Sequence, residues 1–257
     1  MRIKEIVESI EPGSLLIVHA SFKASREEGI SPEQMIKMLM ERLTPEGTLM
    51  MPTFTYHYSG IGFPPYDPAT SPGVLNGVLS ETFRQMPDVL RSENPTYSVA
   101  AWGKHAELLT RKALPWAGLG HKSSYEYAYQ NGAKILLFNV RNNRNSMLHY
   151  AEVAAGLPYN DIPFRECWGR RANTIKGEMT LVEEFPACSE EFLKFDELFL
   201  KEGIARQLGN SMLLDSVKMV DYVIRKMQET PDIMLCHEMC CEPCILRRRR
   251  LRERGLI

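Results

Sequence analysis

The chain has 257 residues, of which 44% are hydrophobic and 25% are charged, a composition typical of a folded globular protein that excludes collagen-like, low-complexity and disordered chains. The formal net charge is −1, but residues 247–254 contain six arginines and one glutamate, a net of +5, which leaves −6 for residues 1–246. An acidic body with one basic tip argues against a nucleic-acid partner, because proteins that bind DNA or RNA spread lysine and arginine over a face.

The length fits one large α/β domain or two small ones. No apolar run approaches the ~18 residues needed to cross a bilayer, and the first residues lack the apolar stretch of a signal peptide. We therefore expect a cytoplasmic protein without a membrane partner. Cysteine usage points the same way: the first cysteine is Cys167, and four of the six lie from Cys236 to Cys244, which is no disulfide framework.

The first elements have the pattern of a βαβ unit. Residues 15–18 are a short apolar run that fits a buried strand. Ser31 is a suitable N-cap and Pro32 a suitable first-turn residue, so a helix is predicted from here to just before Gly47. Residues 48–51 are the next apolar run. We expect the two strands to be parallel and joined by a right-handed crossover.

A long loop separates this unit from the middle of the chain. Residues 54–73 are rich in proline and glycine and predict a loop of about twenty residues, a length usually associated with function. Helices are predicted at 74–86 and 104–112, on either side of a strand at 98–102. Residues 134–138 are the clearest buried strand in this part of the chain. These elements continue the α/β alternation.

The second half alternates less regularly. It predicts a hairpin arm at 177–182, a helix at 189–203 and an amphipathic helix at 213–229. Neither an internal repeat nor a Ser/Gly linker is present. We therefore expect a single three-layer α/β domain with a central, largely parallel sheet over residues 1–231. Residues 232–257 are expected to be a Cys-rich and Arg-rich C-terminal appendage.

A histidine and a glutamate follow the strand at 134–138. An asparagine-rich turn at 139–145 leads into a helix that begins near Ser146 and carries His149 and Glu152. Spacing of three places both on one helix face, at the sheet edge where ligands of α/β proteins bind. Glu152 could orient the imidazole and raise its basicity, so that His149 takes a proton from an attacking amine or hydroxyl. The alternative is a hydrogen-bonded core histidine beside a solvated glutamate.

Three common enzyme signatures are missing. No Gly-x-Gly-x-x-Gly follows the first strand, and neither Gly-x-x-x-x-Gly-Lys-Ser/Thr nor Gly-x-Ser-x-Gly occurs in the chain. These motifs bind dinucleotides, cradle phosphates or expose a nucleophilic serine. Rossmann dehydrogenases, P-loop enzymes and standard α/β-hydrolases are therefore disfavoured.

Several short motifs occur in a fixed order between residues 14 and 160. They are Val18-His19-Ala20-Ser21, Thr44-Pro45-Glu46-Gly47-Thr48, Pro52-Thr53-Phe54-Thr55, Tyr66 to Pro72, Arg91 to Gly103, Gly118-Leu119-Gly120 and Asn145 to Glu152. Together they strongly resemble the aminoglycoside 3-N-acetyltransferases, also called the antibiotic acetyltransferase family. Several motifs in one order are far more specific than any one of them alone.

The resemblance implies an α/β fold of the antibiotic acetyltransferase type, distinct from the GCN5-related acetyltransferases. It implies acetyl-coenzyme A as the donor and a small-molecule amine, on an aminoglycoside or related aminosugar, as the acceptor, with antibiotic resistance as the outcome. The family's Leu-His-x-Ala-Glu motif matches Leu148 to Glu152, so His149 and Glu152 are the implied catalytic residues. His149 would deprotonate the amine as it attacks the thioester, since a protonated amine is no nucleophile.

The resemblance places the donor at the loop after the first strand, where the family typically has His-Ser-Ser-Leu-Ser and a glycine-containing turn. Here the loop begins with His19-Ala20-Ser21-Phe22-Lys23, and Arg26-Glu27-Glu28-Gly29 replaces the usual glycines. We expect coenzyme A to contact the loop and two nearby strand ends through Ser21, Phe22, Lys23, Thr53 and Ser98. For the last two, buried capping hydroxyls are the alternative. The altered loop also supports a rival function, a non-catalytic or regulatory relative that keeps the fold.

An aminoglycoside is a polycation, so its pocket should be acidic, which the net charge of −6 over residues 1–246 permits. The candidate acids, each with solvated surface as its alternative, are Asp67, Glu152, Asp161, Glu183 and Glu184. Arg141 and Arg144 would repel a polycation if they pointed inward. Another biosynthetic amine is therefore an alternative acceptor. A homodimer is left open.

The C-terminal cysteines lie outside the stretch that resembles the family. The segment is Cys236-His237-x-x-Cys240-Cys241-x-x-Cys244, and thiolate and imidazole are ligands that zinc prefers. Zinc is thus a candidate cofactor at Cys236, His237, Cys240, Cys241 and Cys244. Nine residues are a short span for four ligands, so reduced surface cysteines are the alternative to a zinc site. If the cysteines are the functional centre, the protein is a metal or redox module, which is a third candidate function. The arginines that follow are interpreted as a solvated tail, with contact to an acidic partner or to coenzyme A phosphates as the alternative.

Overall fold

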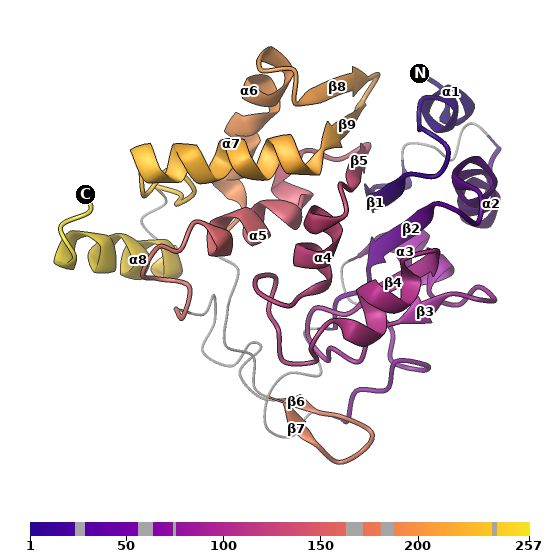
Figure 1. Cartoon of the computed structure of the whole chain (residues 1–257), viewed down its shortest axis with the longest axis horizontal. Coiled ribbons are helices and arrows are strands. Elements are labelled where there is room, and N and C mark those ends of the chain that lie inside the picture. Colours follow the sequence, from indigo (N-terminus) through magenta and orange to yellow (C-terminus); the bar gives the residue numbers. More distant parts are fainter. Residues whose placement is uncertain (24–28, 56–63, 74–75, 163–171, 181–187, 238–240) are drawn as a thin grey trace.

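The computed structural model describes residues 1–23, 29–55, 64–73, 76–162, 172–180, 188–237 and 241–257. These residues build three layers, with a seven-stranded sheet in the middle and helices on both faces (Figure 1). The strand order is β3-β4-β2-β1-β5-β9-β8. Two apolar clusters fill the spaces between the sheet and its two helical layers. The predicted three-layer α/β fold is confirmed.

Three parallel strands form the centre of the sheet. They are β1 (Leu15–Ala20), β2 (Thr48–Pro52) and β5 (Lys134–Phe138), and β1 lies between the other two. All three are buried along almost their whole length, because helices cover both faces. Successive side chains of β1 point to opposite faces, so that Leu16 and Ile17 belong to different apolar clusters.

Antiparallel strands flank this centre on both sides. β4 (Val99–Gly103) pairs with β2, and the short β3 (Leu90–Arg91) pairs with β4. On the other side, β9 (Ser211–Asp215) pairs with β5 and forms a hairpin with β8 (Ala205–Leu208). Within the described sheet, two of the six pairings are parallel. The expectation of a largely parallel sheet thus holds only for the centre, because β4 follows β3 and β9 follows β8 without the crossover helix that a parallel neighbour needs.

Three helices cover the face of the sheet on the right of Figure 1. They are α1 (Ile3–Glu8), α2 (Pro32–Leu43) and α3 (Gly77–Phe83). The predicted N-cap of α2 is confirmed. The Ser31 hydroxyl accepts the backbone N–H of Gln34 at 3.1 Å, and the Gln34 side chain accepts the N–H of Ser31 at 2.7 Å. This reciprocal pair is a capping box, which fixes the helix start.

The opposite face carries the elements that build the candidate active site. Helices α5 and α7 pack against each other there. The bounds on this side are η3 (Leu108–Lys112), α4 (Ser124–Gln130), η4 (Asn142–Arg144), α5 (Met147–Ala154), η5 (Glu190–Lys194), α6 (Phe195–Lys201) and α7 (Ser216–Glu229). A separate small hairpin consists of β6 (Ala172–Asn173) and β7 (Met179–Thr180). The helices of the described ranges are all too short or too polar to span a bilayer.

Helix α8 (Glu242–Glu253) packs onto the domain. Cys244 and Leu251 are fully buried in the larger apolar cluster, and Arg247 is fully buried beside them. The interpretation of the arginine run as a solvated tail is therefore wrong for Arg247. Helical spacing explains this, since Arg247 follows Cys244 by three residues and precedes Leu251 by four, on one face. The domain boundary between residues 231 and 232 stays a prediction.

Two of the predicted helices differ from the observed elements. The helix predicted from residue 213 begins at Ser216, because residues 211–215 are β9 and the Asp215 side chain caps the helix by accepting the N–H of Lys218 at 3.0 Å. The apolar run of β9 continues the apolar pattern of α7, so periodicity alone joins the two. The helix predicted at 104–112 is only the short η3.

Candidate active site

His149 and Glu152 lie together on α5, as their spacing predicts. Nδ1 of His149 is 3.2 Å from Oε2 of Glu152. The Glu152 side chain is 1% exposed and that of His149 is 12% exposed, so Glu152 is not the solvated neighbour of the alternative interpretation. Because a carboxylate only accepts hydrogen bonds, this contact makes Nδ1 the donor and leaves Nε2 as the basic nitrogen.

Arg247 of α8 is the cationic partner of Glu152. Its Nη1 lies 3.2 Å from Oε1 of Glu152, and the Arg247 side chain is 0% exposed. Nη2 donates to the carbonyl oxygen of Ile162 at 2.5 Å, and the guanidinium lies over the ring of Tyr159, 5.0 Å from its centroid. A buried carboxylate without a cation is strongly destabilising. Arg247 therefore supplies the charge that Glu152 needs beside His149.

A phenylalanine from η5 packs against the imidazole. The ring centroids of Phe192 and His149 lie 4.8 Å apart with the planes tilted by 56°, and Phe192 is fully buried. Phe192 thus restrains the ring by packing, and Glu152 restrains it through Nδ1. The Nε2 edge is the part of the imidazole that these contacts leave for a substrate.

The asparagine-rich turn before α5 is held by its own side chains. Oδ1 of Asn142 accepts from Nδ2 of Asn145 at 2.9 Å, and Oδ1 of Asn145 accepts the N–H of Met147 at 3.2 Å, which forms an Asx turn just before α5. Asp196 of α6 accepts from the N–H and the Nδ2 of Asn142 at 3.1 and 2.7 Å. The turn therefore sets where α5 begins, and with it the position of His149.

The three parallel strands end at the sheet edge where α5 begins. Ser21 follows β1, Thr53 follows β2, and residues 139–145 follow β5. The backbone N–H of Ser21 donates to the carbonyl oxygen of Phe138 at 2.9 Å, so the end of β1 runs beside the turn that leads to His149. The predicted donor residues and the predicted base thus share one edge of the sheet.

Thr53 and Ser98 belong to a buried polar network around Arg91. Their hydroxyl oxygens lie 3.2 Å apart, and both residues are fully buried. Arg91 donates through Nε to the Thr53 hydroxyl at 3.1 Å, and through Nη2 to the Thr53 carbonyl at 2.9 Å and the Ser98 hydroxyl at 3.3 Å. This matches the alternative of buried, internally bonded hydroxyls. Contact of either residue with coenzyme A stays a prediction.

The other predicted donor contacts lie just after β1. Phe22 is 7% exposed and packs in the apolar cluster under α2 and α3, with its ring centroid 6.5 Å from that of Phe138. Lys23 is exposed and Ser21 half-buried. Residues 24–28, where this chain departs from the family motif, lie outside the described residues. Of the three loop residues, Ser21 and Lys23 present side chains to the surface.

The acids proposed for a cationic acceptor have other partners. Glu152 is bonded to the two residues described above. Asp161 pairs with Arg250 at 3.2 Å, and Asp67 accepts from the backbone and the hydroxyl of the turn that follows it. Residues 183–184 lie outside the described residues. Both carboxylate oxygens of Glu152 are therefore already engaged, one by His149 and the other by Arg247.

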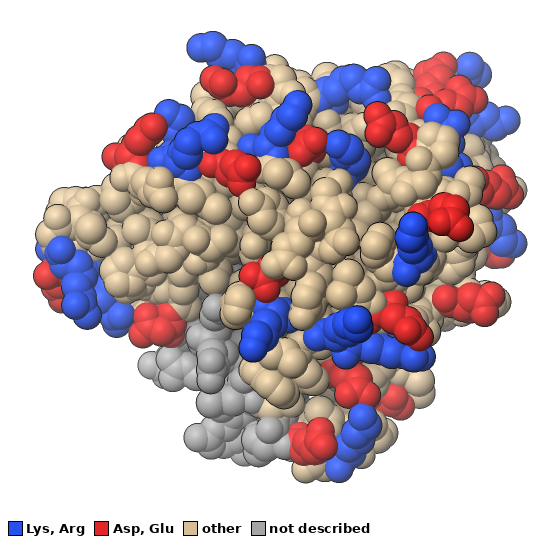
Figure 2. All heavy atoms as spheres, viewed as in Figure 1, with Lys and Arg blue, Asp and Glu red and all other residues tan. Residues whose placement is uncertain are grey.

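Arg141, in the asparagine-rich turn, has an acidic partner on α6. Nε of Arg141 lies 2.5 Å from Oδ2 of Asp196, so the repulsion of a polycation expected from Arg141 is offset, while Arg144 is exposed. Figure 2 shows the same mixing on a larger scale, with basic and acidic side chains interspersed over the face in view. A cationic acceptor therefore meets no unbalanced positive charge at Arg141.

Three residues near the site were missed by sequence reasoning. Arg247 could have been identified as a buried residue from its helical spacing relative to Cys244 and Leu251 on α8. Phe192 and Cys188 have no such signal, because each reaches its partners through contacts with residues far away in the chain. Cys188 joins Cys236, Cys241 and Cys244 in one cluster. Of the other candidate zinc ligands, His237 is exposed and residue 240 lies outside the described residues.

Comparison with known proteins gives consistent matches. The family model for aminoglycoside 3-N-acetyltransferase matches residues 17–228. An aminoglycoside N(3)-acetyltransferase IV from Salmonella sp is 36% identical over 205 residues, which cover 78% of this chain and 73% of the relative.

Solved structures match along nearly the whole chain. The aminoglycoside acetyltransferase AAC(3)-IVa, as a histidine-to-alanine mutant in complex with a gentamicin, is 28% identical with a TM-score of 0.79, and the match covers 97% of both chains. The binary complex of AAC-IIIb with CoASH is 23% identical with a TM-score of 0.74, over 89% of this chain and 97% of the other. The second match shows the fold alone.

Proposed function

The chain belongs to the aminoglycoside 3-N-acetyltransferase family, and we propose that it transfers an acetyl group from acetyl-coenzyme A to an amine of an aminoglycoside with His149 as the general base. Membership makes it an acyltransferase whose donor is acetyl-coenzyme A. The observation that carries the choice of base is the 3.2 Å contact between His149 and the buried Glu152. It lies inside the matched stretch, at the sheet edge where the parallel strands end.

The geometry around His149 suits removal of a proton from an attacking amine. Nδ1 is engaged with Glu152, so Nε2 carries the free lone pair. As the acceptor nitrogen attacks the thioester carbonyl carbon, a C–N bond forms and a proton passes from nitrogen to Nε2. The C–S bond then breaks, the acetyl group stays on nitrogen as an amide, and the proton passes to the departing coenzyme A thiolate.

Glu152 and Arg247 support this proton transfer without touching the substrate. The imidazolium that forms during attack is stabilised by the adjacent carboxylate, which also keeps Nε2 pointing away from Glu152. Arg247 takes one carboxylate oxygen of Glu152 and His149 takes the other. Each oxygen thus has its own partner. Arg247 is a positioning residue in this scheme.

The donor is assigned to the sheet edge beside the start of α5. Ser21 and Lys23 are the predicted contacts whose side chains are accessible, and a lysine there suits the phosphates of coenzyme A. Thr53 and Ser98 hold the neighbouring strand ends through Arg91. AAC-IIIb, which has the same fold, binds CoASH.

The acceptor is assigned as an aminoglycoside because the relative AAC(3)-IVa binds a gentamicin. The net charge of −6 over residues 1–246 also favours approach of a polycation. Cysteine usage fits a reducing compartment, so we place the reaction in the cytoplasm. A homodimer stays a prediction.

A thiol-release assay tests the proposed reaction. The protein is incubated with acetyl-coenzyme A and, separately, gentamicin, apramycin and glucosamine, while the appearance of free thiol is followed. We expect thiol release with an aminoglycoside and little with glucosamine. If no acceptor releases thiol and calorimetry detects no binding of coenzyme A, the chain is a non-catalytic relative and the proposal is overturned.

A further inference from the structure

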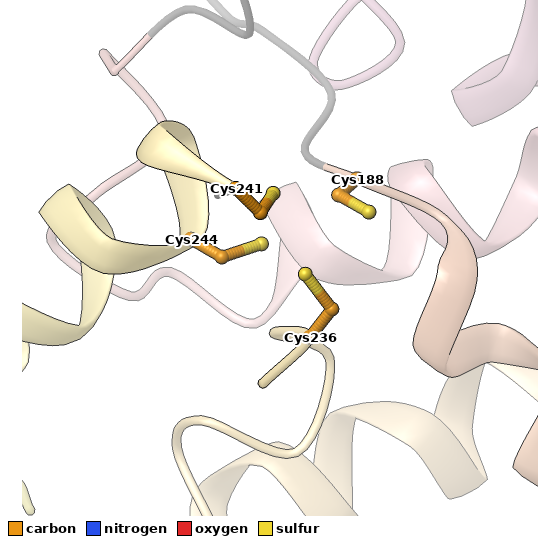
Figure 3. Close-up of side chains that lie close together, drawn as sticks. All are labelled: Cys188, Cys236, Cys241 and Cys244. Atoms are coloured by element: carbon orange, nitrogen blue, oxygen red, sulfur yellow. The ribbon is translucent and has the colours of Figure 1, made fainter. Parts of the chain in front are cut away.

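Four of the six cysteines of the chain meet beside the start of α8. Cys188 precedes η5, Cys236 lies in the loop after α7, and Cys241 and Cys244 lie at the start of α8. Figure 3 shows the four side chains pointing toward one another from these three segments. Their sulfur atoms all lie within 4.8 Å of one another.

We propose that this cluster is a structural zinc site with all four thiolates as ligands. Zinc prefers four tetrahedral ligands, and Zn–S bonds of about 2.3 Å place the sulfurs about 3.8 Å apart. Small side-chain movements bring sulfurs that lie within 4.8 Å of one another to this geometry. Four sulfur donors leave no position for water or substrate, which is the mark of a structural site.

The arrangement answers the objection that nine residues cannot supply four ligands. Three ligands come from residues 236–244, and the fourth, Cys188, lies 48 positions before Cys236. The exposed His237 and residue 240 are not needed for a complete set. In the part of the chain that the structure describes, the four cysteines are not linked by disulfides. Four mutually close sulfurs suit one tetrahedral ion better than two separate bridges.

The surroundings of the cluster also suit an anionic metal centre. Cys244 is fully buried and Cys236 is 2% exposed. Cys241 and Cys244 also lie at the N-terminal end of α8, where the helix dipole favours negative charge. The helix N-terminus therefore stabilises an anionic metal centre at this position.

The site joins the two segments that support His149. Four residues after Cys188 comes Phe192, which packs on the imidazole. Three residues after Cys244 comes Arg247, which holds Glu152. One ion bound to both segments fixes η5 relative to α8. The assignment of the metal site does not depend on the proposed acetyl transfer, because it follows from the sulfur positions alone.

Metal analysis of the purified full chain tests the site. Protein prepared under reducing conditions without chelator is expected to contain one zinc per chain by plasma mass spectrometry. The variant Cys188→Ser should bind zinc at least ~100-fold more weakly, since even changes outside the ligand set cost up to that much. The matched variant His237→Ala should keep its zinc. Zinc retained by Cys188→Ser, or lost from His237→Ala, would overturn the four-cysteine assignment.

A second measurement uses the wild-type chain and so does not depend on how a cysteine variant folds. X-ray absorption at the zinc edge of the as-purified protein is expected to show four sulfur neighbours at about 2.3 Å. Nitrogen or oxygen neighbours in place of one or more sulfurs would overturn the proposal. So would wild-type protein that contains no stoichiometric metal and takes up none when reduced and supplied with zinc, or that contains iron instead.

Discussion

The stretch from β1 to α5 and the stretch from η5 to α8 contribute to one site in different ways. In the first, His149 and Glu152 are three residues apart on one helix and meet through local geometry. In the second, Phe192 and Arg247 reach the site because distant segments fold back onto α5. The family match ends at residue 228, before α8. The proposed base and the residues that contact it therefore come from different parts of the chain, and the α5 motif supplies only His149 and Glu152.

Removing the proposed base is expected to have the largest effect. His149→Ala should lower kcat for acetyl transfer to gentamicin by about 10²–10⁴-fold, the usual contribution of general-base catalysis. Affinity for coenzyme A, measured by calorimetry, should stay near that of the wild type, because the described contacts of His149 are with Glu152 and Phe192. His121→Ala is the control, since the His121 side chain is 70% exposed. Undiminished turnover of His149→Ala would remove the base assignment.

Replacing Arg247 is expected to lower the stability of the folded protein. Arg247→Met should lower the free energy of unfolding by about 3–5 kcal/mol in urea titrations, because it leaves the buried Glu152 without its cation. Arg249→Met, at an exposed position on the same helix, should change it little. Adding Glu152→Gln to Arg247→Met should recover part of the loss, since the uncompensated charge is then gone. Equal losses for the two arginine variants would contradict the buried ion pair.

The polar network of Thr53, Ser98 and Arg91 should contribute less to stability than the ion pair of Arg247. Ser98→Ala removes the hydroxyl that bonds to Thr53 and Arg91 and leaves their buried polar groups short of a partner. The expected loss in unfolding free energy is about 1–3 kcal/mol. Ser14→Ala is the matched control, because its hydroxyl bond is exposed. Unchanged stability of Ser98→Ala, together with weaker coenzyme A binding, would reassign Ser98 from support of the sheet to direct donor contact.

A buried histidine in β1 has the smallest effect at neutral pH and adds a pH dependence in acid. Burial lowers the pKa of His19 from 6.5 to about 3, and within the described part of the chain its Nε2 has no hydrogen-bond partner. The native state therefore stays neutral while the unfolded state takes up a proton below pH 6.5, so stability falls as the pH falls toward 3. His19→Leu should lessen this acid loss by about 1.4 kcal/mol per pH unit. If the free energy of unfolding fell equally with pH in the wild type and in His19→Leu, His19 would not be the cause of the acid loss.

The first stretch could be predicted because its signals are local. Ser31 and Pro32 mark the start of α2, the apolar run at 134–138 matches β5, and the spacing of His149 and Glu152 places them together. Each depends on residues within one element or its cap. The resemblance to the family could also be recognised from the sequence, because several such motifs occur in a fixed order.

The second stretch could not be predicted in the same way. The apolar run of β9 merges with the pattern of α7, so its strand pairing with β5 is invisible to periodicity. Cys188 has no neighbour in sequence that marks it as a partner of Cys244. The burial of Arg247 was not predicted, because a run of arginines is usually solvated. Its spacing from Leu251 does place it on the buried face of α8. Long-range contacts decide these positions.

The claim that a distant segment holds the base in place is tested most directly by the kcat of Arg247→Met. The measurement is made with acetyl-coenzyme A and gentamicin, at a temperature where circular dichroism shows the variant to be folded. We predict a kcat lower by about 10²-fold, the cost of a misplaced catalytic group, with the KM for acetyl-coenzyme A near the wild-type value. A folded variant with wild-type kcat would contradict the account, because Glu152 and His149 would then be positioned without α8.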